Sequence, residues 1–162
     1  MFLQVFTTGG TIDKIYFDQL SEFQIGDSMV EQILGDAGVT FDYSIESLMK
    51  KDSLEINDVD RELIRFKVES SNAQHILITH GTDTMAQTAA VLQGVENKTI
   101  VLTGAMQPAR FRTTDAIYNV GFAIAATQTL AAGVYIAMSG QVFEAGHVRK
   151  NRAEGRFEAI KN

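Results

Sequence analysis

Three short apolar segments of this chain end directly in motifs rich in glycine and threonine, and this arrangement most limits how the chain can fold. The segments are residues 2–6, 75–79 and 99–103, and the motifs after them are Thr8-Gly9-Gly10-Thr11, His80-Gly81-Thr82-Asp83-Thr84 and Gly104-Ala105-Met106. β-Branched and aromatic side chains favour strands, and parallel strands bring their carboxyl ends to one rim, where open α/β sheets bind ligands. We therefore expect the three motifs to meet in one crevice.

Helical and strand patterns alternate along the rest of the chain. Residues 28–37, 57–70, 85–93 and 114–129 have helical features, and residues 40–48 and 133–138 have the pattern of further strands. Alternation of this kind predicts right-handed crossovers and a three-layer α/β/α fold with a mostly parallel sheet. A length of 162 residues indicates a single domain.

Capping patterns give the expected starts of the first two helices. Ser28 and Glu31 have the spacing of a capping box, which predicts a short helix from there to residue 37. Asn57 or Asp58 is expected to cap the second helix. The inner face of this second helix is expected to consist of Val59, Leu63, Phe66 and Val68.

Irregular segments flank this regular pattern. Residues 13–27 have no clear period, which indicates a functional lid or loop, or an irregular hairpin. Either Thr114 or Asp115 is expected to cap the helix that ends near residue 129. Residues 142–143 and the segment around Val148 predict a late β-hairpin that continues beyond the sheet.

Composition excludes several classes of function. The formal net charge of −6 and a pI of about 5.0 argue against a nucleic-acid or anionic-membrane partner, because phosphate binding needs clustered Lys and Arg. The chain has no cysteine and three histidines, a composition without a zinc-binding pattern. No signal-peptide pattern and no apolar stretch of membrane-spanning length is present in the sequence, so we expect a cytoplasmic location.

The hydroxyl groups at the strand ends point to nucleophilic chemistry. Thr11 and Thr82 would face each other across the crevice, with Asp83 adjacent to Thr82. A threonine hydroxyl needs a base to act as a nucleophile, and Lys150, desolvated beside a carboxylate and a hydroxyl, can provide one. Each feature also has a simpler alternative. The glycines can form a tight turn in which the threonines hydrogen-bond only locally. Lys150 can be a solvated surface lysine.

The same segments resemble a known family. Residues 8–12 (TGGTI) and residues 78–85 (ITHGTDTM) resemble the two signature motifs of the bacterial-type L-asparaginase family. Residues 101–108 (VLTGAMQP), Thr114-Asp115-Ala116 with Asn119, and residues 148–151 (VRKN) resemble further segments of that family. The similarity covers nearly the whole chain.

The resemblance implies a role for each of five residues. Thr11 would be the primary nucleophile, and Tyr16 would be the tyrosine of a flexible loop that polarises it. Thr82, Asp83 and Lys150 would form a second catalytic triad.

The resemblance also implies how the substrate is held. Ser53 would grip the α-carboxylate of the substrate, and Asp83 would hold its α-amino group. Gly10, Gly81 and Ala105 would line the same substrate site. No metal or organic cofactor would be needed.

The family's fold is a large α/β domain followed by a smaller one, which implies that residues 1–162 form an asparaginase N-terminal-type domain without the C-terminal domain. In the family a neighbouring subunit supplies an acidic residue to each site, so we expect a homo-oligomer, at least a dimer. The expected reaction is hydrolysis of the side-chain amide of asparagine, or of glutamine, to the acid and ammonia.

Two other functions remain as alternatives. The chain can be a non-catalytic or partner-dependent module of the asparaginase fold that binds an amino acid. A nucleotide site at Gly9-Gly10 is a weaker alternative, because the spacing is not G-x-G-x-x-G. His80 is expected to be a packed histidine at a strand end rather than a catalytic base.

Overall fold

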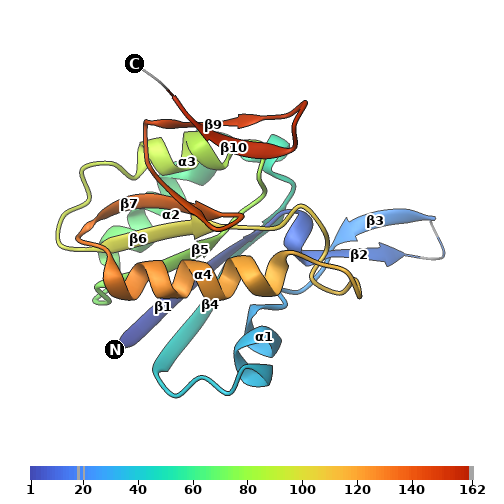
Figure 1. Cartoon of the computed structure of the whole chain (residues 1–162), viewed down its shortest axis with the longest axis horizontal. Coiled ribbons are helices and arrows are strands. Elements are labelled where there is room, and N and C mark those ends of the chain that lie inside the picture. Colours follow the sequence, from blue (N-terminus) through green and yellow to red (C-terminus); the bar gives the residue numbers. More distant parts are fainter. Residues whose placement is uncertain (18, 20, 161–162) are drawn as a thin grey trace.

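The computed structural model describes residues 1–17, 19 and 21–160, and its centre is a six-stranded sheet (Figure 1). The strands lie in the order β4-β1-β5-β6-β7-β8. Neighbouring strands from β4 to β7 pair in parallel, whereas β8 pairs with β7 antiparallel. The bounds are Phe2–Gly9 (β1), Asp42–Lys51 (β4), His75–Thr79 (β5), Thr99–Thr103 (β6), Gly133–Met138 (β7) and Gln141–Glu144 (β8).

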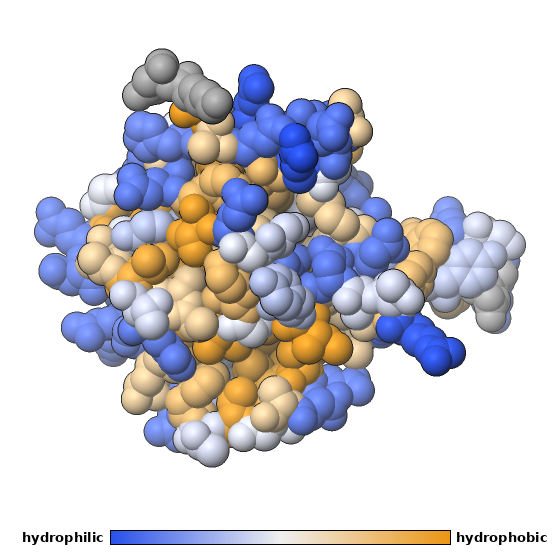
Figure 2. Space-filling model, in the orientation of Figure 1, coloured by the Kyte–Doolittle hydropathy of each residue, from blue (hydrophilic) through white to orange (hydrophobic). Residues whose placement is uncertain are grey.

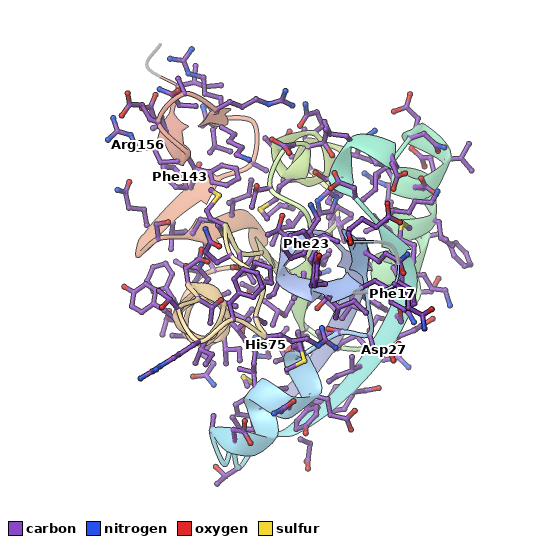
Figure 3. The ribbon with its side chains drawn as sticks, turned by 90° about the vertical axis from the view of Figure 1, so that its right-hand side faces the viewer. Phe17, Phe23, Asp27, His75, Phe143 and Arg156 are labelled. Carbon is purple, nitrogen blue, oxygen red and sulfur yellow. The ribbon has the colours of Figure 1, made fainter. Side chains whose placement is uncertain are left out.

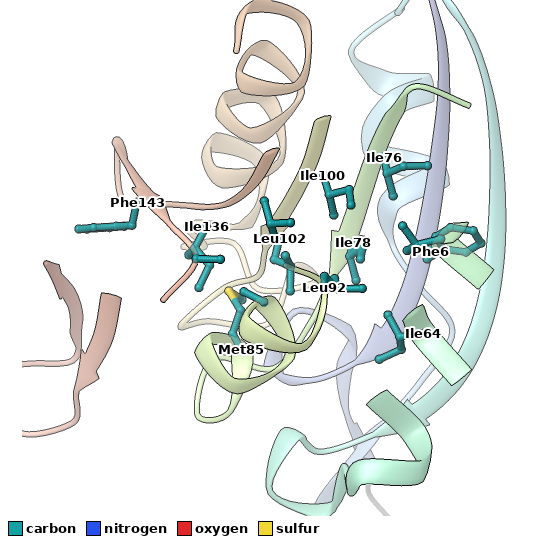
Figure 4. Close-up of a cluster of buried hydrophobic side chains, with 14 of the residues drawn as sticks. Phe6, Ile64, Ile76, Ile78, Met85, Leu92, Ile100, Leu102, Ile136 and Phe143 are labelled. Carbon is teal, nitrogen blue, oxygen red and sulfur yellow. The ribbon is translucent and has the colours of Figure 1, made fainter. Parts of the chain in front are cut away.

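Helices cover both faces of this sheet, which confirms the predicted three-layer fold. On one face, α2 (Asp58–Ser70) and α3 (Met85–Val91) bury Ile64 and Met85 against the sheet, in the cluster that Figure 4 shows. On the other face, α1 (Val30–Asp36) and α4 (Ala116–Thr129) pack against a second cluster. None of the helices in the described part of the chain is long and apolar enough to cross a membrane.

The last part of the chain differs from the prediction. Residues 142–143 lie in β8, which belongs to the main sheet because the Ser139-Gly140 turn, with φ of 52° and 78°, folds β8 back onto β7. The late hairpin consists instead of β9 (Val148–Asn151) and β10 (Arg156–Ala159), which pair antiparallel. This hairpin packs its buried side chains against the α3 face of the core.

Within residues 13–27, the described segments 14–17 and 22–25 pair as a hairpin, the second of the two predicted alternatives. Its strands are β2 (Lys14–Phe17) and β3 (Glu22–Ile25), and they pair antiparallel. The hairpin projects from the body of the molecule (Figures 1 and 2). One turn of 3-10 helix, η1 (Thr11–Asp13), joins it to β1, so the hairpin starts directly after the glycine motif.

Predictions for the helices were partly wrong. No capping box forms at α1; the Ser28 hydroxyl accepts the Val30 N–H at 3.3 Å, and no side-chain hydrogen bond comes from the N-cap residue Met29. A capping box starts α2, where Asn57 and Asp60 each accept the other's backbone N–H. The buried residues of α2 are Arg61, Ile64 and Val68, whereas Val59, Leu63 and Phe66 are exposed.

Candidate active site

The candidate site lies at the carboxyl ends of β1 and β5, where two glycines bring two loops into backbone contact. A Cβ atom on Gly10 would lie 2.4 Å from Cα of Gly81, and Gly10 has a φ of +88°, so neither space nor conformation suits a larger residue. The next residues along the two loops are Thr11 and Thr82. The structure therefore brings the two threonine-bearing loops together at one rim of the sheet, as the sequence predicts.

Lys150 links the second threonine to its neighbouring carboxylate. Its ammonium nitrogen donates to Thr82 Oγ1 at 2.7 Å and to Asp83 Oδ1 at 2.9 Å. The lysine side chain is 14% exposed and the Asp83 side chain 30%. This partial burial keeps water from screening the charge pair fully, so the Thr82 hydroxyl is held in a strong local field. The hairpin β9–β10 provides the lysine, and the loop after β5 provides the other two residues.

Ser53 packs directly against the loop that carries Thr82 and Asp83. It is 1% exposed and starts the 3-10 turn η2 (Ser53–Glu55) after β4. Its hydroxyl accepts the Asp83 N–H at 3.2 Å, and its carbonyl accepts the Thr84 hydroxyl at 2.6 Å. A Cβ atom on Gly81 would lie 2.6 Å from Cβ of Ser53, so the glycine makes this close packing possible.

The loop after β6 supplies the third wall of the site, and one carboxylate fixes its shape. Ala105 is buried in this loop. The Asp115 carboxylate accepts the backbone N–H groups of Met106 and Gln107 and the side-chain amide of Asn119. Asp115 therefore holds the loop and does not cap α4; the Thr114 hydroxyl instead accepts the Ala116 N–H at 3.1 Å.

Asn119 connects the same loop to the end of β7. Its amide donates to the Gly104 carbonyl at 3.0 Å, and its side-chain oxygen accepts the Ser139 N–H at 3.0 Å. Asn119 is fully buried, so water does not compete for these hydrogen bonds. Sequence reasoning missed this role, and the only signal for it was a polar residue on the inner face of a helix that is otherwise apolar there.

His80 is buried beside the site and does not reach it. Its Nδ1 lies 2.7 Å from the Gly81 carbonyl, which can only accept, so this nitrogen carries the proton. Nε2 then accepts the Thr88 hydroxyl at 2.8 Å. Burial lowers the pKa of His80 to about 4. The ring is therefore neutral near pH 7, and its predicted packing role is consistent with these contacts.

The family model described as asparaginase, N-terminal, matches residues 3–162. The chain belongs to the asparaginase family. The resemblance inferred from the glycine and threonine motifs is thus confirmed.

Several proteins of this family are similar to the chain. A probable periplasmic L-asparaginase of Haemophilus influenzae is 34% identical over 65% of this chain and 32% of its own length. A glutaminase-asparaginase of Pseudomonas aeruginosa is 31% identical over 75% of the chain and 34% of its own length. One component of a glutamyl-tRNA(Gln) amidotransferase from Methanococcus vannielii is 36% identical over 62% of the chain and 26% of its own length.

A solved asparaginase has the same fold. The thermostable L-asparaginase from Thermococcus kodakarensis aligns with a TM-score of 0.83 and 27% identity, over 98% of this chain and 51% of the solved one. The chain thus spans about half of the solved asparaginase and a quarter to a third of the curated relatives.

Tyr16 stands apart from the other asparaginase-type residues. It lies on β2, is 52% exposed, and packs edge-on against Phe23 across the hairpin, with ring centroids 5.5 Å apart. No hydrogen bond joins it to Thr11 within the described residues. Figure 3 looks onto this hairpin and shows Phe17 and Phe23 on it.

Arg152 is a charged neighbour of the site that sequence reasoning missed. Its Nε lies 3.3 Å from Asp83 Oδ1, the oxygen that also accepts from Lys150. The Arg152 side chain is 64% exposed, so it is a second cation beside the carboxylate, and water screens its charge. Arg152 lies in the turn that follows β9, two positions after Lys150, and no periodic pattern in the sequence marks it.

Proposed function

We propose that this chain hydrolyses the side-chain amide of asparagine, or of glutamine, with Thr11 as the nucleophile. The observation that carries the proposal is the Lys150 ammonium, bonded to both Thr82 and Asp83 one residue from the Gly10–Gly81 contact. A threonine, a carboxylate and a partly buried lysine in mutual contact form the kind of unit that can activate a hydroxyl or a water molecule.

The proposed reaction has two steps. The Thr11 hydroxyl oxygen attacks the amide carbon, the carbon–nitrogen bond breaks, and the nitrogen leaves as ammonia with the proton from the hydroxyl. Water then attacks the resulting ester, which releases the acid and restores Thr11. Lys150 and Asp83 hold Thr82 so that its hydroxyl receives the proton or activates the water.

Backbone N–H groups would stabilise the negative oxygen that develops on the amide. The Gly10 N–H is bonded to the Lys51 carbonyl at 2.9 Å, so it is not free for this task. The Thr82 N–H donates to no atom of the described residues and is the better candidate. Removing one such donor costs about 10²–10³ in rate in other enzymes.

The remaining predicted residues position the substrate. Asp83 keeps one carboxylate oxygen for the α-amino group, because Lys150 and Arg152 both contact the other oxygen. The Ser53 hydroxyl has its proton available for the α-carboxylate, since its lone pair already accepts the Asp83 N–H. Gly10, Gly81 and Ala105 would form the walls of the same site.

We further propose that residues 1–162 act as an asparaginase N-terminal-type domain and assemble into at least a dimer. A neighbouring copy would supply the acidic group that the resemblance implies, and Tyr16 would close over Thr11 when the hairpin moves. We expect the reaction in the cytoplasm, since a solved relative from Campylobacter jejuni is named a probable cytoplasmic L-asparaginase; the Haemophilus relative is named periplasmic.

Ammonia release tests the proposed function. Purified chain is incubated separately with asparagine and with glutamine, and Thr11→Ala serves as the blank. Release that disappears in the blank is expected. If no ammonia appears while aspartate raises the melting temperature, the chain binds an amino acid without turnover, and the amidase proposal fails.

A further inference from the structure

A groove between α3 and β9, which lie side by side in Figure 1, has no role in the proposed reaction. Its volume is about 440 Å³, within the range of small-molecule sites. Space is available there because Ala86, Ala90 and Gly146 carry small side chains or none. Asp83 and Lys150 also line the groove, so it is continuous with the candidate active site.

Arg152 lines the same groove and has hydrogen-bond donors to spare. Its Nε lies 3.3 Å from Asp83 Oδ1, and its side chain is 64% exposed. Within the described part of the chain, none of its N–H groups makes a hydrogen bond. A guanidinium presents its donors in a planar fork that fits a carboxylate with two parallel hydrogen bonds. Arg152 is therefore suited to an anionic group in the groove.

Positive charge predominates around the groove, although the whole chain has a formal net charge of −6. Arg149, Lys150 and Arg152 line it, and Asp83 is the single carboxylate among the described residues that do so. Asp83 is already compensated by Lys150 and Arg152. Arg149 is a weaker contributor, because it pairs across the hairpin with Glu158, 3.9 Å away. An anion in the groove would thus meet Arg152 with little repulsion.

The proposed binding of asparagine leaves one direction in which a substrate can be larger. The amide end is held at Thr11, where the reaction occurs. The α-carboxylate end is closed, because Ser53 is 1% exposed and packs against Gly81. The α-nitrogen lies at Asp83, which is the residue that borders the groove. A substituent on the α-nitrogen would therefore extend into the groove.

We propose that the groove receives an acidic acyl group on the α-nitrogen of asparagine, and that Arg152 determines this specificity. The inference rests on the proposed amidase function and names its substrate class, which includes asparagine at the carboxyl end of an acidic peptide. Acylation removes the positive charge of the α-amino group, which Arg152 would otherwise repel, and keeps one N–H for Asp83. The bond that breaks is still the side-chain amide, and ammonia is still released.

Three synthetic substrates isolate the effect of charge. N-succinyl-, N-butyryl- and N-(4-aminobutyryl)-asparagine carry similar acyl chains that end in a carboxylate, a methyl group and an ammonium group. In the wild type, kcat/KM for ammonia release should decrease in this order, by about fivefold between the first and the last, as expected for a charge pair at an exposed side chain. The difference should lie in KM, because the acyl group binds away from the reacting atoms.

Arg152→Gln should remove most of this preference, because it takes away the cation that distinguishes the acyl groups. Arg156→Gln is the matched control on the same hairpin. The Arg156 side chain is 62% exposed, and its Nε lies 3.0 Å from a Glu158 oxygen, but Arg156 is not among the residues that line the groove. The control removes the same charge from the chain and should keep the wild-type preference.

A second test does not depend on turnover. Titration calorimetry measures the Kd of N-succinyl-aspartate and of N-(4-aminobutyryl)-aspartate, the products of two of the substrates. The succinyl compound should bind about fivefold more tightly to the wild type, and Arg152→Gln should abolish most of this difference. Salt at about 0.5 M should also reduce the difference, because it screens an exposed charge pair.

Each result supports or overturns a separate statement. A preference for the succinyl compounds that persists in Arg152→Gln, or that Arg156→Gln reduces equally, would overturn the inference. Ammonia release from asparagine but from none of the acylated substrates would also overturn it. If no substrate yields ammonia while the Kd difference depends on Arg152, the amidase proposal fails and the acidic-group site remains.

Discussion

At the scale of single residues, the candidate site depends on glycines that allow backbones to touch. Gly10 packs against the backbone of Gly81, and Gly81 in turn packs against the side chain and backbone N of Ser53, so three loops meet closely. A methyl group at either glycine would separate loops that carry Thr11, Thr82 and Asp83. The geometry of the candidate site therefore depends on the absence of a side chain at Gly10 and Gly81 as well as on its reactive groups.

Gly10→Ala tests this close approach. The added Cβ would overlap the Gly81 backbone and would occupy a positive-φ conformation, so the free energy of unfolding should fall by about 2 kcal/mol or more. Urea denaturation measures this change. Gly35→Ala is the matched control, because nothing lies within 4 Å of its Cβ position and its helical conformation suits alanine. The control should be stabilised by about 0.4–1 kcal/mol, and equal losses in both variants would contradict the account.

His80 should make stability depend on pH. Its pKa is lowered to about 4 in the folded state, so the unfolded chain binds a proton more readily between pH 6.5 and 4. Acidification through this window should cost about 3 kcal/mol, since each pKa unit corresponds to about 1.4 kcal/mol. Urea denaturation at pH 7 and pH 4.5 should show this loss in the wild type and a smaller one in His80→Gln. The same loss in both proteins would rule out His80 as its source.

Sequence reasoning at this scale found the residues that stand within a motif. Thr82, Asp83 and Lys150 were predicted to act together, and the structure places them in contact. The loop-holding role of Asp115 and the contact of Arg152 were not found, because their partners lie across loops whose paths no periodic pattern encodes. Backbone N–H groups, which Asp115 binds, leave no trace in a sequence.

At the scale of secondary structure, buried strands were predicted best. Residues 75–79, 99–103 and 133–138 are strands with the predicted bounds, since continuous apolar runs between turn residues leave few alternatives. The phase of α2 was predicted wrongly, because apolar side chains were assumed to face inward, whereas the buried set includes Arg61. The pairing of β8 was also missed, because a two-residue turn at Ser139-Gly140 lacked the usual asparagine or aspartate before glycine.

The capping box of α2 gives a prediction at this scale. Asn57→Ala removes the acceptor of the Asp60 N–H and should lower the free energy of unfolding by about 1 kcal/mol. Thermal or urea denaturation measures the effect. Glu62→Ala, at an exposed position of the same helix, should change stability little. If both variants behave alike, the cap does not contribute to stability.

At the scale of the whole molecule, the sheet order explains why the motifs converge. β1 and β5 are neighbours and β6 lies beside β5, so three consecutive strands carry the three motifs to one rim. This arrangement followed from the alternation of strands and helices and could be predicted. The position of the β2–β3 hairpin could not, because its contacts are made through Asp13 and Arg110 rather than through a repeating pattern.

Self-association is a prediction for the whole molecule. Several large apolar side chains are exposed, including Val59, Phe66, Ile117 and Tyr118, and Figure 2 shows apolar surface on the face that carries α4. Such surface favours association with a second copy. Light scattering should give at least twice the mass of the chain at micromolar concentration. A monomer that is fully active would contradict the proposed need for a neighbouring copy.

The central claim is that the hydroxyl group of residue 11 carries the reaction, and replacing Thr11 in two ways tests it most directly. The kcat/KM for ammonia release from asparagine is compared among wild type, Thr11→Ser and Thr11→Ala. The account predicts that serine, which keeps the hydroxyl, retains measurable activity, whereas alanine loses at least about 10³-fold. Alanine and serine variants with equal activity would contradict the claim and place the nucleophile elsewhere.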